Sequence, residues 1–225
     1  MHRPASVGRL LGLIFILAIG GVLFSTHGAM TDSLTQVTSL ASLNSNDSVA
    51  WSQVGPDATL LSTSFNANSV GGIAITGTLA GSGSLTSVVC PASQCSWGSP
   101  GSGGFNAGDT VIWTSDTANG GNGPLTLAFS KSVAGAGAII QADGPAQFTA
   151  QIQAFNGNNS LGSFNTTSDT DGDAVFLGVL DNTAAHITSV VYSLTACTGA
   201  CTDFAIDTLF INTSGGNRCM RRCMR

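Results

Sequence analysis

The chain has 225 residues, of which 43% are hydrophobic and 8% are charged. Between Met30 and Asn217 it carries twelve aspartates and one lysine, Lys131, but neither arginine nor glutamate, so this body has a formal charge of −11. A single cation cannot neutralise a phosphate backbone, clamp a nucleotide or bind an anionic membrane. The composition therefore excludes nucleic acid as a partner, and it does not identify a substrate.

The N-terminal segment has the layout of a secretory signal peptide. Arg3 and Arg9 precede an apolar run from Leu10 to Phe24, and small residues follow up to Ala29. As a helix this run would be about 22 Å long, which is shorter than the roughly 30 Å hydrocarbon core of a bilayer. We therefore expect residues 1–29 to be a helical signal peptide that is removed, leaving no membrane span. An uncleaved anchor is the alternative.

The body, residues 30–213, has the pattern of a β protein. Gly, Ser, Thr and Asn are abundant, and short apolar or alternating runs lie between turn residues. Strands are predicted over 48–53, 60–65, 72–79, 84–89, 110–114, 125–129, 138–141, 146–155, 161–166, 174–180, 187–194 and 204–211. Many short strands without crossover helices favour an all-β fold, an antiparallel β-sandwich, over a parallel sheet.

Side-chain patterns indicate where some of these strands lie. Residues 147–154 alternate between polar and apolar side chains, which predicts a half-buried strand. Segments 174–180 and 204–211 are apolar on both faces and are expected at central positions. The Gly- and Ser-rich segment 95–108 is expected to be a long loop within one domain, because the strands before it are too few to close a core of their own.

The cysteines fall as three close pairs: Cys90 with Cys95, Cys197 with Cys201, and Cys219 with Cys223. In an exported chain this evenness indicates disulfides, and the first two pairs would be local clips on loops. A zinc site is the alternative, because the last two pairs both have the spacing C-x3-C. Residues 214–225 are a basic tail that we expect to be disordered, with a cationic or redox-active appendage as the alternative.

Three aspartates could hold a cation. Asp169, Asp171 and Asp173 alternate in the run SDTDGDAV, where Gly172 allows a tight turn, so their oxygens can converge on one calcium ion. The run is not a complete EF-hand, because Leu180 occupies the twelfth position in place of a bidentate Glu. A solvated turn between strands is the equally weighted alternative.

Other side chains give less support for chemistry. Trp97, beside Cys95, could stack on a sugar and form a glycan-binding site, although an exposed tryptophan without a function is the simpler interpretation. Trp113 is expected in the core. His186 precedes a strand without a catalytic motif around it and is expected to be structural. Since no pair of carboxylates is marked out as acid and base, we predict that the protein is not an enzyme.

Several segments of the body, taken in order, resemble a known family. The runs at 123–143, 148–162, 174–179, 187–194 and 203–211 are similar to secreted bacterial β-sandwich domains of PEP-CTERM-type exported proteins, which resemble galactose-binding-like jelly rolls. This resemblance implies a jelly roll exported to the cell surface, and it makes Asp207 a second candidate ligand of a structural ion, or else a turn cap. The Pro-Glu-Pro sorting tail is absent, since the chain lacks glutamate.

These observations lead to one expected function and two alternatives. We expect a secreted, non-enzymatic β-sandwich of the cell surface or extracellular matrix, stabilised by calcium and making weak contacts with glycans or other proteins. The first alternative is a carbohydrate-active enzyme or its binding module. The second is a subunit of a surface layer or filament, in which calcium would have to bridge the acidic copies.

Overall fold

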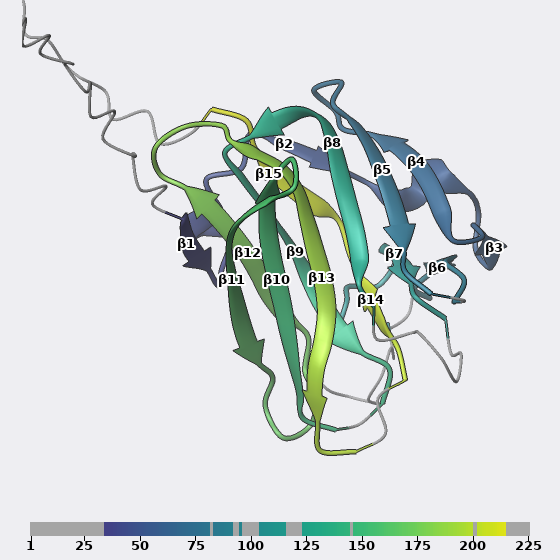
Figure 1. Cartoon of the computed structure of the whole chain (residues 1–225). Coiled ribbons are helices and arrows are strands. Elements are labelled where there is room, and N and C mark those ends of the chain that lie inside the picture. Colours follow the sequence, from purple (N-terminus) through teal and green to yellow (C-terminus); the bar gives the residue numbers. More distant parts are fainter. Residues whose placement is uncertain are drawn as a thin grey trace, which may run out of the picture. The chain divides into compact units, whose positions relative to one another are not determined.

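The computed structural model describes residues 34–81, 83–91, 95, 104–115, 123–144, 146–199 and 202–214. These residues all belong to the compact unit Asp32–Arg225. They form two antiparallel β-sheets packed face to face, which confirms the predicted all-β sandwich (Figure 1). The predicted signal peptide, the candidate ligand Trp97 and most of the basic tail lie outside the described residues.

The first sheet has six strands. In spatial order they are β11 (Asn159–Thr167), β10 (Phe148–Asn156), β13 (Ile187–Cys197), β8 (Leu125–Val133), β5 (Ala74–Leu79) and β4 (Ser64–Asn68). This order is visible from left to right across the front of Figure 1. In β10 buried and half-buried residues alternate, as the sequence predicts.

The second sheet has nine strands. Its main order is β1 (Leu34–Val37), β12 (Val175–Asp181), β9 (Gly135–Ala142), β14 (Phe204–Ile206), β7 (Thr110–Trp113), β6 (Thr86–Val89) and β3 (Thr59–Leu60), while β15 (Leu209–Asn212) pairs with both β9 and β2 (Asp47–Val49). Strand β12 lies between β1 and β9, and β14 lies between β9 and β7. The two doubly apolar segments therefore occupy central positions, as expected.

Three predicted strands are interrupted. Segment 48–53 ends as a strand at Val49 and continues as the 3₁₀ helix η1 (Trp51–Val54). Segment 60–65 is divided between β3 and β4 by a turn in which Ser62 has a φ of 59°. Segment 204–211 breaks at Asp207 and Thr208 into β14 and β15. The prediction of a single strand was wrong for each of these segments. The sequence pattern continues across the break, whereas the position of the break depends on contacts with distant parts of the chain.

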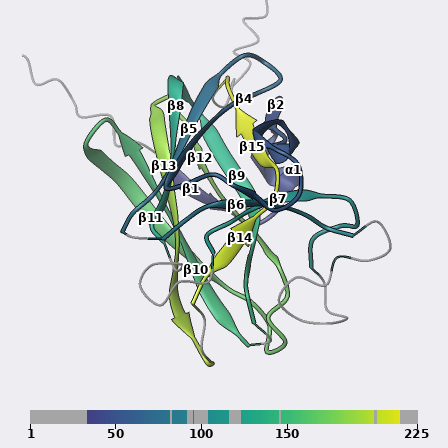
Figure 2. The same cartoon turned by 90° about the vertical axis from the view of Figure 1, so that its right-hand side faces the viewer.

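Two short elements near residue 40 have no counterpart in the predicted strands. Strand β1 pairs with β12, and helix α1 (Leu40–Leu43) follows it. Ser39 caps α1, because its hydroxyl accepts a hydrogen bond from the backbone N–H of Ser42 at 3.3 Å. Leu43 is buried beside Gly135 of β9, where a Cβ atom would come within 2.9 Å of its Cδ1. Figure 2 shows α1 beside β15.

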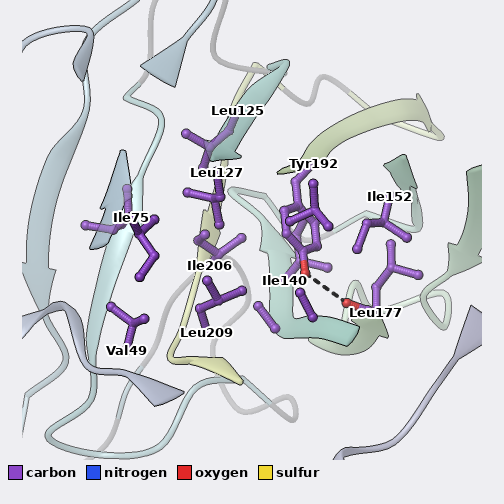
Figure 3. Packing of buried hydrophobic residues seen from close by; sticks show 14 of the residues in the cluster. Val49, Ile75, Leu125, Leu127, Ile140, Ile152, Leu177, Tyr192, Ile206 and Leu209 are labelled. Atoms are coloured by element: carbon purple, nitrogen blue, oxygen red, sulfur yellow. Dashed lines mark hydrogen bonds between the residues drawn. The ribbon is translucent and has the colours of Figure 1, made fainter. Parts of the chain in front are cut away.

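The core fills the space between the two sheets (Figure 3). Fully buried side chains from both sheets meet there, including Ile152 and Tyr192 on one side and Ile140 and Leu177 on the other. Each such aliphatic side chain contributes roughly 1.5–3 kcal/mol by leaving water. The buried hydroxyl of Tyr192 donates a hydrogen bond to the carbonyl oxygen of Leu177 at 3.2 Å, which joins the sheets through a polar contact.

Candidate cation site

The predicted acidic run lies in the loop between β11 and β12 and is held against the start of β10. The hydroxyl of Ser168 accepts a hydrogen bond from the backbone N–H of Phe148 at 3.0 Å. The side-chain amide of Gln147 donates to the carbonyl oxygen of Ser168 at 3.1 Å. Because Ser168 is itself buried, these bonds fix the point at which the acidic loop begins.

Asp169 shapes the turn. Its Oδ1 accepts hydrogen bonds from the backbone N–H of Asp171 at 3.2 Å and from that of Asp173 at 2.9 Å. Gly172 has a φ of +80°, a conformation that favours glycine. Within the described part of the chain, no three His, Cys, Asp or Glu side chains gather closely enough to hold a metal ion. The structure therefore does not bring the three predicted carboxylates together, and calcium binding stays a prediction.

The structure adds a residue that the sequence did not single out, Gln141 on β9. Its side chain is completely buried, and its Nε2 donates a hydrogen bond to the carbonyl oxygen of Gly172 at 3.0 Å. Its Oε1 is buried and receives no hydrogen bond, and the same is true of Oδ1 of Asp173. An acceptor buried without a donor costs roughly 1–3 kcal/mol, so two of them in one region call for a compensating positive charge or donor.

Backbone oxygens lie at the same turn. A Cβ atom on residue 172 would be 2.8 Å from the carbonyl oxygen of Ala146 and 3.2 Å from that of Gly144. These two carbonyls belong to the connection between β9 and β10, while Asp173 follows β11. Oxygens of carboxylate, amide and backbone type are the ligands that calcium takes in proteins. The chemistry of this donor set therefore fits a calcium ion.

Charge is distributed unevenly along the sandwich. Asp143 follows β9 and Asp203 precedes β14, and the backbone N–H of Asp143 donates to the carbonyl oxygen of Asp203 at 3.1 Å. We call this end, with the three aspartates of the loop, the acidic end. Lys131 lies near the other end, because Val133 pairs with Ile187 at the start of β13 whereas Phe148 pairs with Cys197 at its finish. The field of the domain therefore favours a cation at the acidic end.

Asp207 is placed elsewhere, with Asp109. It lies in the break between β14 and β15, where its backbone N–H donates to the carbonyl oxygen of Ile139 at 3.0 Å. Burial, helped by the nearby carboxyl of Asp109, raises the pKa of Asp207 to about 6 against the lowering effect of the Thr208 N–H. Asp109 also lines a pocket of about 200 Å³, together with Trp51 and Thr208, among others. Asp109 precedes β7, far from Asp207 in sequence, so local spacing gave no signal for the pair.

His186 belongs to the turn between β12 and β13. Its Nδ1 lies 2.8 Å from Oδ2 of Asp181, a fully buried carboxylate. Oδ1 of Asp181 also accepts hydrogen bonds from the hydroxyl and N–H of Thr183 and from the N–H of Ala184. Burial raises the pKa of Asp181, but these hydrogen bonds together lower it more, so its pKa lies below the usual value. His186 therefore helps to hold the turn through its contact with Asp181.

Cys90 and Cys95 form the predicted disulfide, with their Cα atoms 4.8 Å apart. Cys197 is also disulfide-bonded. Its predicted partner Cys201 lies outside the described residues, as do Cys219 and Cys223. A cysteine in a disulfide has no thiolate to give to zinc. The alternative of a four-cysteine zinc site is therefore wrong for Cys197.

The two tryptophans that the structure describes are engaged in the fold. Trp51 is fully buried, its ring packs edge-on against Phe65 with centroids 5.6 Å apart, and its Nε1 donates to the carbonyl oxygen of Asp207 at 2.8 Å. Trp113 is half-buried, not fully in the core as expected, and its Nε1 donates to Oδ2 of Asp203 at 3.0 Å. Trp51 is thus unavailable as a sugar platform, and Trp97 stays a prediction.

The described residues contain no helix that is both long and apolar enough to cross a membrane. No protein-family model, curated protein or solved structure matches the chain. The resemblance to exported bacterial β-sandwich domains therefore rests on the sequence segments that carry it.

Proposed function

We propose that this protein is an exported, non-enzymatic β-sandwich of the cell surface or extracellular matrix, stabilised by calcium and making weak contacts with glycans or other proteins. The observation that carries the proposal is the disulfide between Cys90 and Cys95. Disulfides persist in oxidising compartments outside the cytoplasm. The charged and apolar N-terminal segment, which has the layout of a signal peptide, supports the same compartment.

Asp109 and Asp207 are neighbouring carboxyls, since Asp109 helps to raise the pKa of Asp207. Glycosidases use two carboxyls, which lie about 5–5.5 Å apart in retaining enzymes and farther apart in inverting ones. No sequence motif marks Asp109 and Asp207 as acid and base, so a carbohydrate-active enzyme stays the alternative to the non-enzymatic protein that we propose.

Export can be tested with the complete chain. Expressed with its N-terminal segment in a bacterial host, the protein should appear outside the cytoplasm, with an intact mass that corresponds to removal of about the first 29 residues. Cys90 and Cys95 should resist alkylation before reduction. Recovery from the cytoplasm with the N-terminal segment intact and both thiols free would contradict the proposal. Melting curves in millimolar calcium and in a chelator would test the calcium-stabilised part.

A glycan-binding module is a second candidate, favoured by a pocket of about 340 Å³. It is lined by Asn46, Asp47, Ser48 and Phe210, with Val70 at 87% exposure on its border. Amide, carboxylate and hydroxyl groups beside an aromatic ring are the groups that recognise sugars. On a glycan array, Val70→Asp should abolish binding at this pocket. Leu60→Asp, at another exposed apolar residue, should not, and equal loss in both variants would contradict this site.

A further inference from the structure

The inference begins from Gln141, a glutamine in a strand that is otherwise apolar. A glutamine side chain has two N–H donors and one oxygen with two lone pairs. Nε2 of Gln141 donates to the carbonyl oxygen of Gly172, which fixes the amide plane against the acidic loop. Oε1 of the same amide is buried and receives no hydrogen bond. This side chain is therefore held with an unsatisfied oxygen at the acidic end of the sandwich.

The second unsatisfied oxygen is Oδ1 of Asp173. The backbone N–H of Asp173 donates to Oδ1 of Asp169 at 2.9 Å, so the residue is fixed within the turn. One peptide bond joins Asp173 to Gly172, whose carbonyl oxygen is the acceptor for Gln141. Both oxygens thus belong to side chains at the place where β9 contacts the loop. Two acceptors cannot satisfy each other, but a cation can satisfy both.

We propose that Oε1 of Gln141 and Oδ1 of Asp173 are ligands of one calcium ion that links β9 to the loop between β11 and β12. The carbonyl oxygens of Ala146 and Gly144, which face Gly172, are candidates to complete the ligand set, although that of Gly144 also accepts a hydrogen bond from the N–H of Ala146. Calcium suits this arrangement, because it accepts carboxylate, amide and backbone oxygens in flexible geometry, whereas magnesium demands a near-ideal octahedron and retains several waters.

This ligand set differs from the one that the alternating aspartates predict. Oδ1 of Asp169 is already occupied by two backbone N–H groups, and Asp171 is exposed. In our proposal Asp171 attracts the ion only through its charge. Asp173 contacts the ion directly. The inference rests on the calcium-stabilised part of the proposed function and specifies which residues hold the ion.

Asp171→Asn and Asp173→Asn make a matched pair, because each removes one negative charge from the same loop. Calcium binding to the full-length exported protein would be measured by titration calorimetry at pH 7, and melting temperature would be followed in calcium and in chelator. Asp173→Asn should weaken calcium binding at least about tenfold, since a charged ligand is lost. Asp171→Asn should weaken it by less than about threefold, since an exposed charge acts through screened solvent.

Gln141→Met gives a second test, because methionine keeps the approximate shape and removes both polar atoms. This variant should melt in chelator at a temperature close to that of the original protein, and the rise caused by calcium should be lost. Equal losses of affinity in the two aspartate variants would overturn the proposal in favour of the three-carboxylate site. Normal calcium stabilisation in Asp173→Asn would overturn it while leaving calcium stabilisation of the protein intact. Failure of the original protein to bind calcium would overturn both this ligand assignment and the calcium-stabilised part of the proposed function.

Discussion

The ring of Phe65 on β4 lies over Gly77, its direct partner on β5. A Cβ atom on residue 77 would overlap Cε1 and Cζ of that ring. The ring cannot move away freely, because it is buried and packs edge-on against Trp51. Aromatic side chains covering a cross-strand glycine are a known device for fixing strand register. The pair therefore holds β4 in place at the edge of its sheet.

The first prediction concerns this pair. Gly77→Ala should lower the free energy of unfolding by about 1–3 kcal/mol, because an added methyl group in a packed region forces its neighbours to move. Urea denaturation would measure the change. In a Phe65→Ala background the same substitution should cost much less, since the overlapping ring is gone. An equal cost in both backgrounds would mean that the ring is not the cause.

The second prediction concerns Asp207 and pH. Because burial and Asp109 raise the pKa of Asp207 to about 6, the folded state binds a proton more tightly than the unfolded state, in which the value is 3.8. The contribution of Asp207 to stability is then fully present below about pH 4 and is lost as pH rises through about 6. The contribution of Asp207 should therefore raise the melting temperature as the pH is lowered from 7 to 4.

Asp207→Asn is the variant that checks this assignment. It keeps an Oδ1 acceptor for the N–H of Thr208, and it removes the titration. The rise in melting temperature between pH 6 and pH 4 should become smaller in this variant. Asp171→Asn, at an exposed residue of the acidic loop, serves as the control and should leave the rise unchanged. A full rise in Asp207→Asn would assign the effect to another group.

The third prediction concerns Asp181, whose pKa is shifted in the opposite direction. Asp181→Ala should cost about 2–4 kcal/mol of unfolding free energy, because it leaves the turn's N–H donors and His186 without their acceptor. Since the pKa of Asp181 is lowered in the folded state, its contribution is present above the unfolded value of 3.8 and is lost as pH falls through the folded value.

The Asp181 contribution would be followed by denaturant unfolding at pH 6 and pH 3. The gap in stability between the original protein and Asp181→Ala should be wide at pH 6 and narrower at pH 3. Thr183→Val removes the hydroxyl donor of Thr183 to the same carboxylate but keeps the backbone N–H donors, so it should cost less than Asp181→Ala. A gap that does not change with pH would show that the carboxylate charge is not responsible.

The fourth prediction concerns the disulfide between Cys90 and Cys95. Replacing both cysteines with alanine should lower the unfolding free energy by about 2 kcal/mol, the amount expected from a very short loop in the chain-entropy model. The fold should persist, because the main core lies between the sheets and does not include these residues. Circular dichroism and urea unfolding would measure both effects. Complete unfolding of the double variant would show that the fold itself depends on the disulfide.

The features predicted correctly are those that a local pattern determines. Alternation along β10 follows from one face lying on the core and the other outside it, and the apolar character of β12 follows from its position between two other strands. The short strand β1 and the break at Asp207 depend on distant partners: β1 pairs with β12, and the break lies where β14 and β15 pair with different parts of β9. These partners lie far away in the sequence, so the local pattern around β1 or Asp207 could not predict them.

Only the part of the candidate site that lies within one short segment was predicted. The loop from Asp169 to Asp173 was found from its spacing, whereas Gln141 belongs to an apolar segment in another part of the chain. One signal did exist, because a glutamine is unusual in a strand that is apolar on both faces. The pairing of Asp109 with Asp207 left no signal, since it depends on the contact between β7 and β14.

Strand β9 has three partners: β12 along one side, and both β14 and β15 along the other. The strands on that second side come from residues 204–212, about 60 to 80 residues further along the chain than their partners in β9. A polypeptide truncated before Phe204 would leave the backbone N–H and C=O groups of that side exposed, and such an edge invites pairing with other molecules. The second sheet is therefore complete only when β14 and β15 have paired with β9. Before that step, the unpaired edge of β9 can pair with other molecules and lead to aggregation.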